Sequence, residues 1–134
     1  MFKHETKVRV RYSETDKMGY CYYGNYAQFF EIGRVEALRA LGFPYKELED
    51  DGIMLPVSDF SVKYLKPALY DDELTIITTI AKLSTFKIVF DYQIKNVNDE
   101  LLTEAQTTLV FVDNKTMKPT KHPKEMSEKL NKYT

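Results

Sequence analysis

The chain has 134 residues, with 19 basic and 20 acidic side chains and a net charge of -1. This length fits one domain with a real hydrophobic core, and the balanced charge indicates neither a nucleic-acid nor a membrane-surface partner. The single cysteine excludes an internal disulfide, no apolar run approaches the roughly 20 residues that span a bilayer, and the first residues lack a signal-peptide core. We therefore expect one domain, residues 1–134, in a cytoplasmic protein.

The first predicted element is a strand over residues 4–12. Thr6, Val8, Val10 and Tyr12 alternate there with basic side chains, which is typical of a half-buried strand. A polar turn over residues 13–19 follows and contains Asp16. That residue either serves the turn, as Asp often does, or places a carboxylate ahead of a helix start, where it can do chemistry.

A long helix is predicted from about residue 23 to residue 41, because no proline interrupts the segment and Gly42 stands where a helix commonly ends. One apolar stripe follows helical spacing: Tyr26, Phe30, Gly33, Ala37 and Leu41. Further apolar residues lie on other faces, so we expect a helix buried on most sides. Its Gly33 predicts the close approach of another backbone.

The remainder of the chain predicts a short helix at residues 44–52 and then four strands, at residues 57–65, 73–82, 85–97 and 100–112. Tight turns are expected at residues 98–99 and 113–115, and a polar helix at residues 123–132. Strands joined by short turns pair antiparallel. The predicted class is α+β, a long central helix wrapped by an antiparallel sheet. One sheet cannot cover such an apolar helix, so a second subunit is expected.

Few residue constellations in the chain suggest chemistry. His4, His122 and Cys21 share no metal-ligand spacing, so no metal site is expected. Cys21 is expected to be a small buried residue. Glu31 and Arg34 have the spacing of a solvated or interface ion pair. The candidate phosphate contacts are basic: Arg11, Lys63, Lys66 and Lys82.

The segment of residues 16–34, DKMGYCYYGNYAQFFEIGR, resembles the signature of the 4-hydroxybenzoyl-CoA thioesterase family of hotdog-fold enzymes. The matching residues, in order, are Asp16, Gly19, Tyr23, Asn25, Tyr26, Phe29 or Phe30, Glu31 and Arg34. Two weaker matches follow, VKYLKPALYDDEL at residues 62–74 and VFVDNKTMKPTKHP at residues 110–123. The resemblance therefore covers nearly the whole chain and implies one hotdog thioesterase domain.

The resemblance implies hydrolysis of an acyl- or aryl-CoA thioester, without a cofactor, because coenzyme A is part of the substrate. In the family, the aspartate at the Asp16 position is the nucleophile or general base. The backbone N–H near Tyr23 polarises the carbonyl oxygen, as a fixed donor can. The implied substrate-binding residues are Gly19, Asn25, Tyr26, Lys63 and Lys66. Active sites at subunit interfaces, in homodimers or homotetramers, are also implied.

Three other functions remain open from the sequence. They are hydrolysis of thioesters on acyl carrier protein, a hotdog dehydratase, and non-catalytic binding of acyl-CoA. A dehydratase would need a histidine in the site, and the central segment contains none. A related family branch, acting on short-chain acyl-CoA, has histidine where this chain has Tyr23, which is closer to the aryl-CoA type. The acyl group itself is not readable from the sequence.

Overall fold

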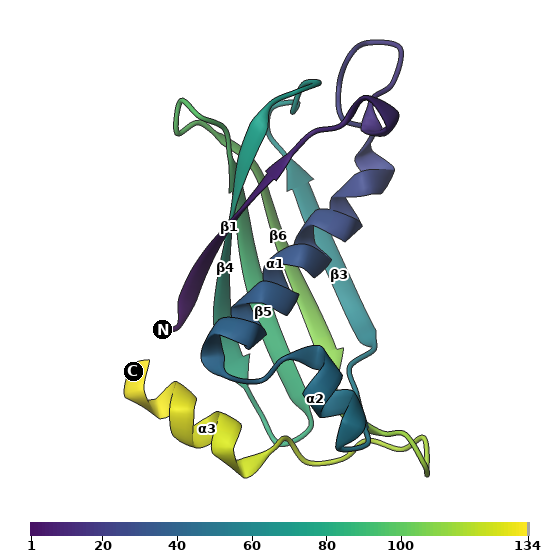
Figure 1. The fold of residues 1–134 in the computed structure, drawn as a ribbon, viewed down its shortest axis with the longest axis vertical. Helices are drawn as coiled ribbons and strands as arrows, with labels where there is room; N and C mark the ends of the chain where they lie inside the picture. Colours follow the sequence, from purple (N-terminus) through teal and green to yellow (C-terminus); the bar gives the residue numbers. More distant parts are fainter. Residues whose placement is uncertain (134) are drawn as a thin grey trace.

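The computed structural model describes residues 1–133 and has an α+β architecture (Figure 1). Five strands form one antiparallel sheet in the spatial order β1-β4-β5-β6-β3. Their bounds are Lys3–Arg9 for β1, Glu73–Leu83 for β4, Lys87–Lys95 for β5, Leu101–Val110 for β6 and Val57–Tyr64 for β3. The long helix α1 (Tyr26–Leu41) lies across one face of this sheet, as Figure 1 shows. The predicted hotdog arrangement is confirmed.

Shorter elements complete the fold. Helix α2 (Tyr45–Asp50) follows α1, and helix α3 (Lys124–Leu130) lies close to the end of the chain. Strands β2 (Ile53–Met54) and β7 (Val112–Asp113) form a second, two-stranded sheet, which the sequence pattern does not predict. Three single 3-10 turns occupy Tyr12–Glu14, Tyr23–Asn25 and Asn131–Tyr133.

Alternation along the strands separates a buried face from an outer face. On β5 the buried side chains are Ile88, Phe90, Tyr92 and Ile94, while Asp91 and Gln93 between them are exposed. Tyr12 and Phe86 fall within the predicted strands 4–12 and 85–97, but they lie outside the observed strands and are 79% and 47% exposed. Each follows or precedes a strand end, where alternation no longer fixes the direction of a side chain.

Helix α1 approaches the sheet closely at Gly33. A Cβ atom at this position would stand 2.5 Å from Thr78 Oγ1 and 2.9 Å from Ile76 Cγ2, both on β4. The close approach predicted for Gly33 is present, but the partner is a pair of side chains and not a backbone. The absence of a side chain at Gly33 therefore sets the distance between the helix and the sheet.

The prediction that α1 is buried on most sides is wrong for the single chain. Gln28, Glu31 and Ile32 of α1 are exposed in the single chain. The sheet can bury only one helix face, since a helix of about 10–12 Å diameter meets a flat layer along one stripe. Beside α1, β3 is an edge strand with exposed apolar side chains, among them Val57 and Phe60, each 45% exposed.

Candidate active site

The loop between β1 and α1 is held in place by the segment of residues 65–70. The backbone N–H of Cys21 donates to the carbonyl of Ala68 at 2.7 Å, and the N–H of Tyr70 donates to the carbonyl of Gly19 at 3.1 Å. An isolated bridge joins Tyr20 to Leu69. Residues 68–70, which are distant in sequence, thus fix the loop that contains Asp16.

Asp16 closes a tight turn with one of its two carboxylate oxygens. Its Oδ1 accepts hydrogen bonds from the backbone N–H groups of Met18 at 2.9 Å and Tyr20 at 3.3 Å. Gly19 occupies the left-handed region of this turn, at φ 78°, and donates its N–H to the Asp16 carbonyl. Within residues 1–133, Oδ2 of Asp16 makes no hydrogen bond or ion pair. Asp16 therefore stabilises the turn through Oδ1, and its Oδ2 has no partner among residues 1–133.

Asp16 lines a hollow of about 280 Å³ at the N-terminal end of α1. The other lining residues come from the loop, the helix start and the end of β3: Tyr20, Cys21, Tyr23, Tyr26, Tyr64, Leu65, Lys66 and Pro67. Most of this wall is aromatic or apolar. Burial raises the pKa of Tyr26 to about 12, so its phenol is a neutral group in this wall. Asp16 itself is half-buried in the single chain, and Tyr23 and Tyr64 of this wall are exposed.

The backbone N–H of Tyr23 opens the 3-10 turn that leads into α1. Among the described residues it donates no hydrogen bond, whereas the preceding N–H of Tyr22 donates to the Glu14 carbonyl at 2.8 Å. The first N–H groups of a helical segment lack internal partners and lie at the positive end of its dipole. Tyr23 thus presents a free donor beside the hollow that Asp16 lines.

Asn25 and Gly19 shape the site without lining the hollow. Asn25 Nδ2 donates to the Glu14 carbonyl at 2.9 Å, and this bond ties the start of α1 to the loop. Glu14 is buried and accepts a hydrogen bond from the backbone N–H of Arg11 at 2.7 Å. For Asn25, expected to touch the substrate, the observed contact is one that positions the loop.

Cys21 lies in the wall of the hollow and is buried, as expected. Burial, together with the nearby carboxylates of Glu14 and Asp16, raises the pKa of its thiol to about 11. A thiol is an effective nucleophile only as the thiolate. At neutral pH Cys21 is therefore a protonated side chain packed beside Asp16.

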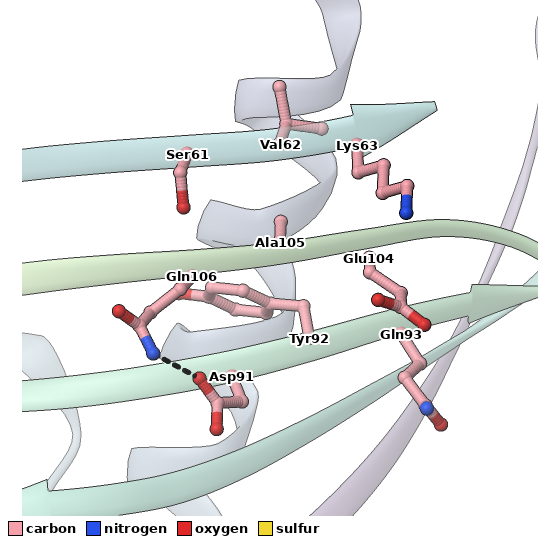
Figure 2. A pocket seen from close by; sticks show the side chains of 9 residues that line it. All are labelled: Ser61, Val62, Lys63, Asp91, Tyr92, Gln93, Glu104, Ala105 and Gln106. Carbon is pink, nitrogen blue, oxygen red and sulfur yellow. Dashed lines mark hydrogen bonds between the residues drawn. The ribbon is translucent and has the colours of Figure 1, made fainter. Parts of the chain in front are cut away.

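The two lysines expected to bind the substrate lie on different faces. Lys66 lines the Asp16 hollow and pairs with Glu100, with Nζ 2.6 Å from Oε2. Lys63 lies on the outer face of the sheet, in a polar hollow of about 460 Å³ (Figure 2). Figure 2 shows it opposite Glu104, with α1 behind the strands. Lys63 lies within β3, whereas Lys66 lies beyond its end, and in one chain only Lys66 joins the Asp16 site.

Other candidate groups lie apart from this hollow. Arg11 pairs with Glu14 at 3.2 Å, and Lys82 lies in a separate hollow with His122. His122 Nδ1 contacts the Ser84 carbonyl at 2.8 Å, and His4 stands on β1. Residues 1–133 contain no group of three or more potential metal ligands and no helix long and apolar enough to cross a membrane.

Comparison with known proteins identifies the family. Residues 10–130 match the model of the thioesterase-like superfamily, which is most of the chain. The chain belongs to this superfamily. Its relatives include the acyl-CoA thioester hydrolase YbgC of Escherichia coli, 37% identical over 89% of each chain. The DHNA-CoA thioesterase of Staphylococcus aureus has the same fold, with a TM-score of 0.93 and 36% identity over 99% of this chain and 91% of that one.

A third relative is named for thioesters on acyl carrier protein and not on coenzyme A. The chloroplastic acyl-acyl carrier protein thioesterase ATL3 of Arabidopsis thaliana is 32% identical over 95% of this chain and 67% of its own length. The prediction that the chain is a thioester hydrolase is confirmed by these relatives. The narrower assignment to the 4-hydroxybenzoyl-CoA family stays a prediction.

Sequence reasoning missed part of the hollow. Tyr64, Leu65 and Pro67 line it from the end of β3, about fifty residues after Asp16. The Tyr64 hydroxyl lies 3.5 Å from the Tyr23 carbonyl, which connects the strand to the helix start. The only available signal was that residues 62–74 also matched the family pattern.

Proposed function

We propose that the chain hydrolyses the thioester of an acyl- or aryl-CoA, with Asp16 as the catalytic carboxylate. The observation that carries the proposal is that Asp16 and Tyr23 line one hollow. Among residues 1–133, Asp16 has a carboxylate oxygen without a partner and Tyr23 a backbone N–H without an acceptor. Thioester hydrolysis requires both groups. One must attack or activate water, and the other must stabilise the charge that develops on the carbonyl oxygen.

The division of roles follows from the geometry of Asp16. Its Oδ1 is held by two backbone N–H groups, which fix the direction of the carboxylate. Oδ2 then either attacks the thioester carbonyl or takes a proton from the attacking water. The N–H of Tyr23 donates a hydrogen bond to the oxyanion that forms from the carbonyl oxygen. A fixed donor in a site that excludes water contributes about 2.7–4 kcal/mol in comparable enzymes.

The thiol of Cys21 and the two histidines supply no alternative in this chain. Cys21 is protonated at neutral pH because its pKa is raised to about 11. Neither His4 nor His122 lines the hollow. Asp16 is therefore the group in the described hollow that fits the role of base or nucleophile.

Replacement of Asp16 by Asn tests the proposal. Asn keeps an oxygen that accepts from Met18 and Tyr20, so the turn and the fold should survive. Turnover of acyl-CoA should fall about 10²–10⁴-fold, the range for a positioned acid–base group. If Asp16 serves only the turn, the Asn variant will hydrolyse acyl-CoA at the rate of the parent protein, and the proposal is wrong.

A single turnover in ¹⁸O-water with enzyme in excess separates the two roles of Asp16. A nucleophilic Asp16 passes through a mixed anhydride, and attack of water on its aspartyl carbonyl places label in the Asp16 carboxylate. A general base leaves label in the acid product alone. Attack of water on the acyl carbonyl of the anhydride gives that second pattern too, so a rapid-quench search for acyl-enzyme completes the test.

Thioesters of acyl carrier protein are the second candidate substrate, because the relative ATL3 acts on acyl-acyl carrier protein. The same acyl group presented on coenzyme A and on acyl carrier protein decides between them. A higher kcat/KM for the coenzyme A thioester supports our proposal, and the reverse order assigns the chain to carrier-protein thioesters.

A further inference from the structure

A second hollow, of about 250 Å³, lies further along the seam between α1 and β3. Its lining residues are Ala27, Gln28, Phe30, Glu31, Arg34, Val57, Phe60 and Thr107. The two hollows lie in series. Tyr26 packs on Tyr64 beside the Asp16 hollow, with ring centroids 5.1 Å apart, and one turn later Phe30 packs on Phe60 at 5.8 Å.

The guanidinium of Arg34 is the unusual group in this second hollow. Arg34 is only 8% exposed, yet no carboxylate among residues 1–133 lies within ion-pair distance of it. The ion pair expected between Glu31 and Arg34 is absent from the structure. A buried charge without a counter-charge is costly, so this position calls for an anion from outside the chain.

The groups that do contact Arg34 are neutral. Its Nε donates to the Tyr45 hydroxyl at 3.2 Å, and the Tyr92 hydroxyl also interacts with the guanidinium. Burial raises the pKa of both phenols above the ordinary value of 10, so neither is a phenolate at neutral pH. They orient the guanidinium without neutralising it.

We propose that the second hollow receives the far end of the acyl group and that Arg34 binds a carboxylate there. The inference rests on the proposed function, since it places the thioester carbonyl at Asp16 and Tyr23. Arg34 comes eight residues after Tyr26, about 12 Å further along the helix. The aromatic seam between them suits an apolar chain, and a guanidinium matches a carboxylate in geometry and charge. The substrate class is then a monothioester of a dicarboxylic acid.

Glu31 lines the same hollow but is exposed and opposes the binding of an anion. It supplies a second variant whose effect has the opposite sign. Loss of the Arg34 charge should weaken the preference for a carboxylate, and loss of the Glu31 charge should strengthen it. Arg39, an exposed arginine of the same helix paired with Glu36 at 3.3 Å, is the matched control.

Binding to the Asp16→Asn protein tests the proposal without hydrolysis. Calorimetry compares adipoyl-, suberoyl-, sebacoyl- and dodecanedioyl-CoA with methyl-ended thioesters of equal length. At the length that reaches Arg34, the carboxylate should bind about 10- to 100-fold more tightly, as expected for a hydrogen-bonded charge pair. Adding Arg34→Gln should bring the ratio close to one, and Glu31→Gln should raise it severalfold. Arg39→Gln should leave it unchanged.

Three results would overturn the proposal: a ratio near one at every chain length, a ratio that Arg34→Gln does not alter, or a ratio that Glu31→Gln does not raise. If Arg34→Gln leaves the ratio intact and weakens self-association, the guanidinium pairs with Glu31 of a second copy. Should Arg34→Gln fail to fold, the ratio in Glu31→Gln still decides. Hydrolysis of the methyl-ended thioesters by the unmodified protein decides the proposed function separately, because the binding ratio needs no turnover.

Discussion

Gly33 of α1 and Thr78 of β4 face each other so closely that a Cβ on the glycine would stand 2.5 Å from the threonine Oγ1. That hydroxyl is buried and has no hydrogen-bond partner within residues 1–133. The contact therefore depends on shape, and no polar bond stabilises it. It positions α1 on the sheet, and the 3-10 turn with the free N–H of Tyr23 leads directly into this helix.

Gly33→Ala should lower the stability of the protein, although alanine favours an exposed helix by about 1 kcal/mol over glycine. The added methyl must displace Thr78 or Ile76, and such overpacking costs about 1–3 kcal/mol. Gly33→Leu should cost more. Urea midpoints of the two variants measure this. A midpoint of Gly33→Ala above that of the parent protein would show that the close contact carries no constraint.

Tyr23→Pro should remove the oxyanion donor and leave the fold intact. Tyr23 is the first residue of its helical turn, where proline is tolerated, and Tyr22 at φ -62° and ψ 132° already has the conformation that precedes proline. We expect turnover to fall about 10²–10³-fold. Tyr23→Ala loses the same side chain but keeps the N–H, so it should retain most of the activity. Equal rates in the two variants would refute a role for this N–H.

The protein should form a dimer through the edge strand β3, whose Val57 and Phe60 are each 45% exposed. Pairing of two such edges buries these side chains and satisfies free backbone groups. Light scattering at micromolar concentration should give at least twice the chain mass of 15.7 kDa. Val57→Lys should shift the protein toward the monomer, while Val97→Lys, at an exposed turn, should not. A stable monomer of the parent protein would end this prediction.

Cys21 should resist alkylation by iodoacetamide at neutral pH. Its pKa is raised from 9.0 to about 11, so the folded protein keeps the proton that the unfolded chain releases near pH 9. This contribution to stability is present below pH 9 and is lost as the pH rises to about 11. Alkylation of the folded protein should accelerate over the same range. Rapid labelling at pH 7 would mean that the thiol is not buried beside Asp16. The Cys21→Ala variant measures the background labelling of other side chains.

Binding of acyl-CoA should weaken with salt, because the phosphates of coenzyme A are anionic. Of the basic residues predicted to contact them, Lys66 lies in the wall of the Asp16 hollow. Lys66→Gln should raise KM and reduce its dependence on ionic strength. Lys124→Gln, on an exposed face of α3, is the control. A KM for Lys66→Gln that matches the parent value at every salt concentration would exclude this lysine.

Helix and strand periods, turns and Gly42 are local signals, so the order of amino acids was enough to predict the fold class. It also singled out Asp16 and the N–H of Tyr23 through one contiguous segment. The packing of β3 beside α1 decided that Lys66, and not Lys63, lines the Asp16 hollow. It also decided that Tyr64 lines this hollow. The packing of α1 against the sheet showed that Arg34 is buried with no carboxylate of residues 1–133 within ion-pair distance, while Glu31, one turn away, is exposed. Spacing along a helix places two side chains near each other, but the neighbouring strand decides which of them loses its water.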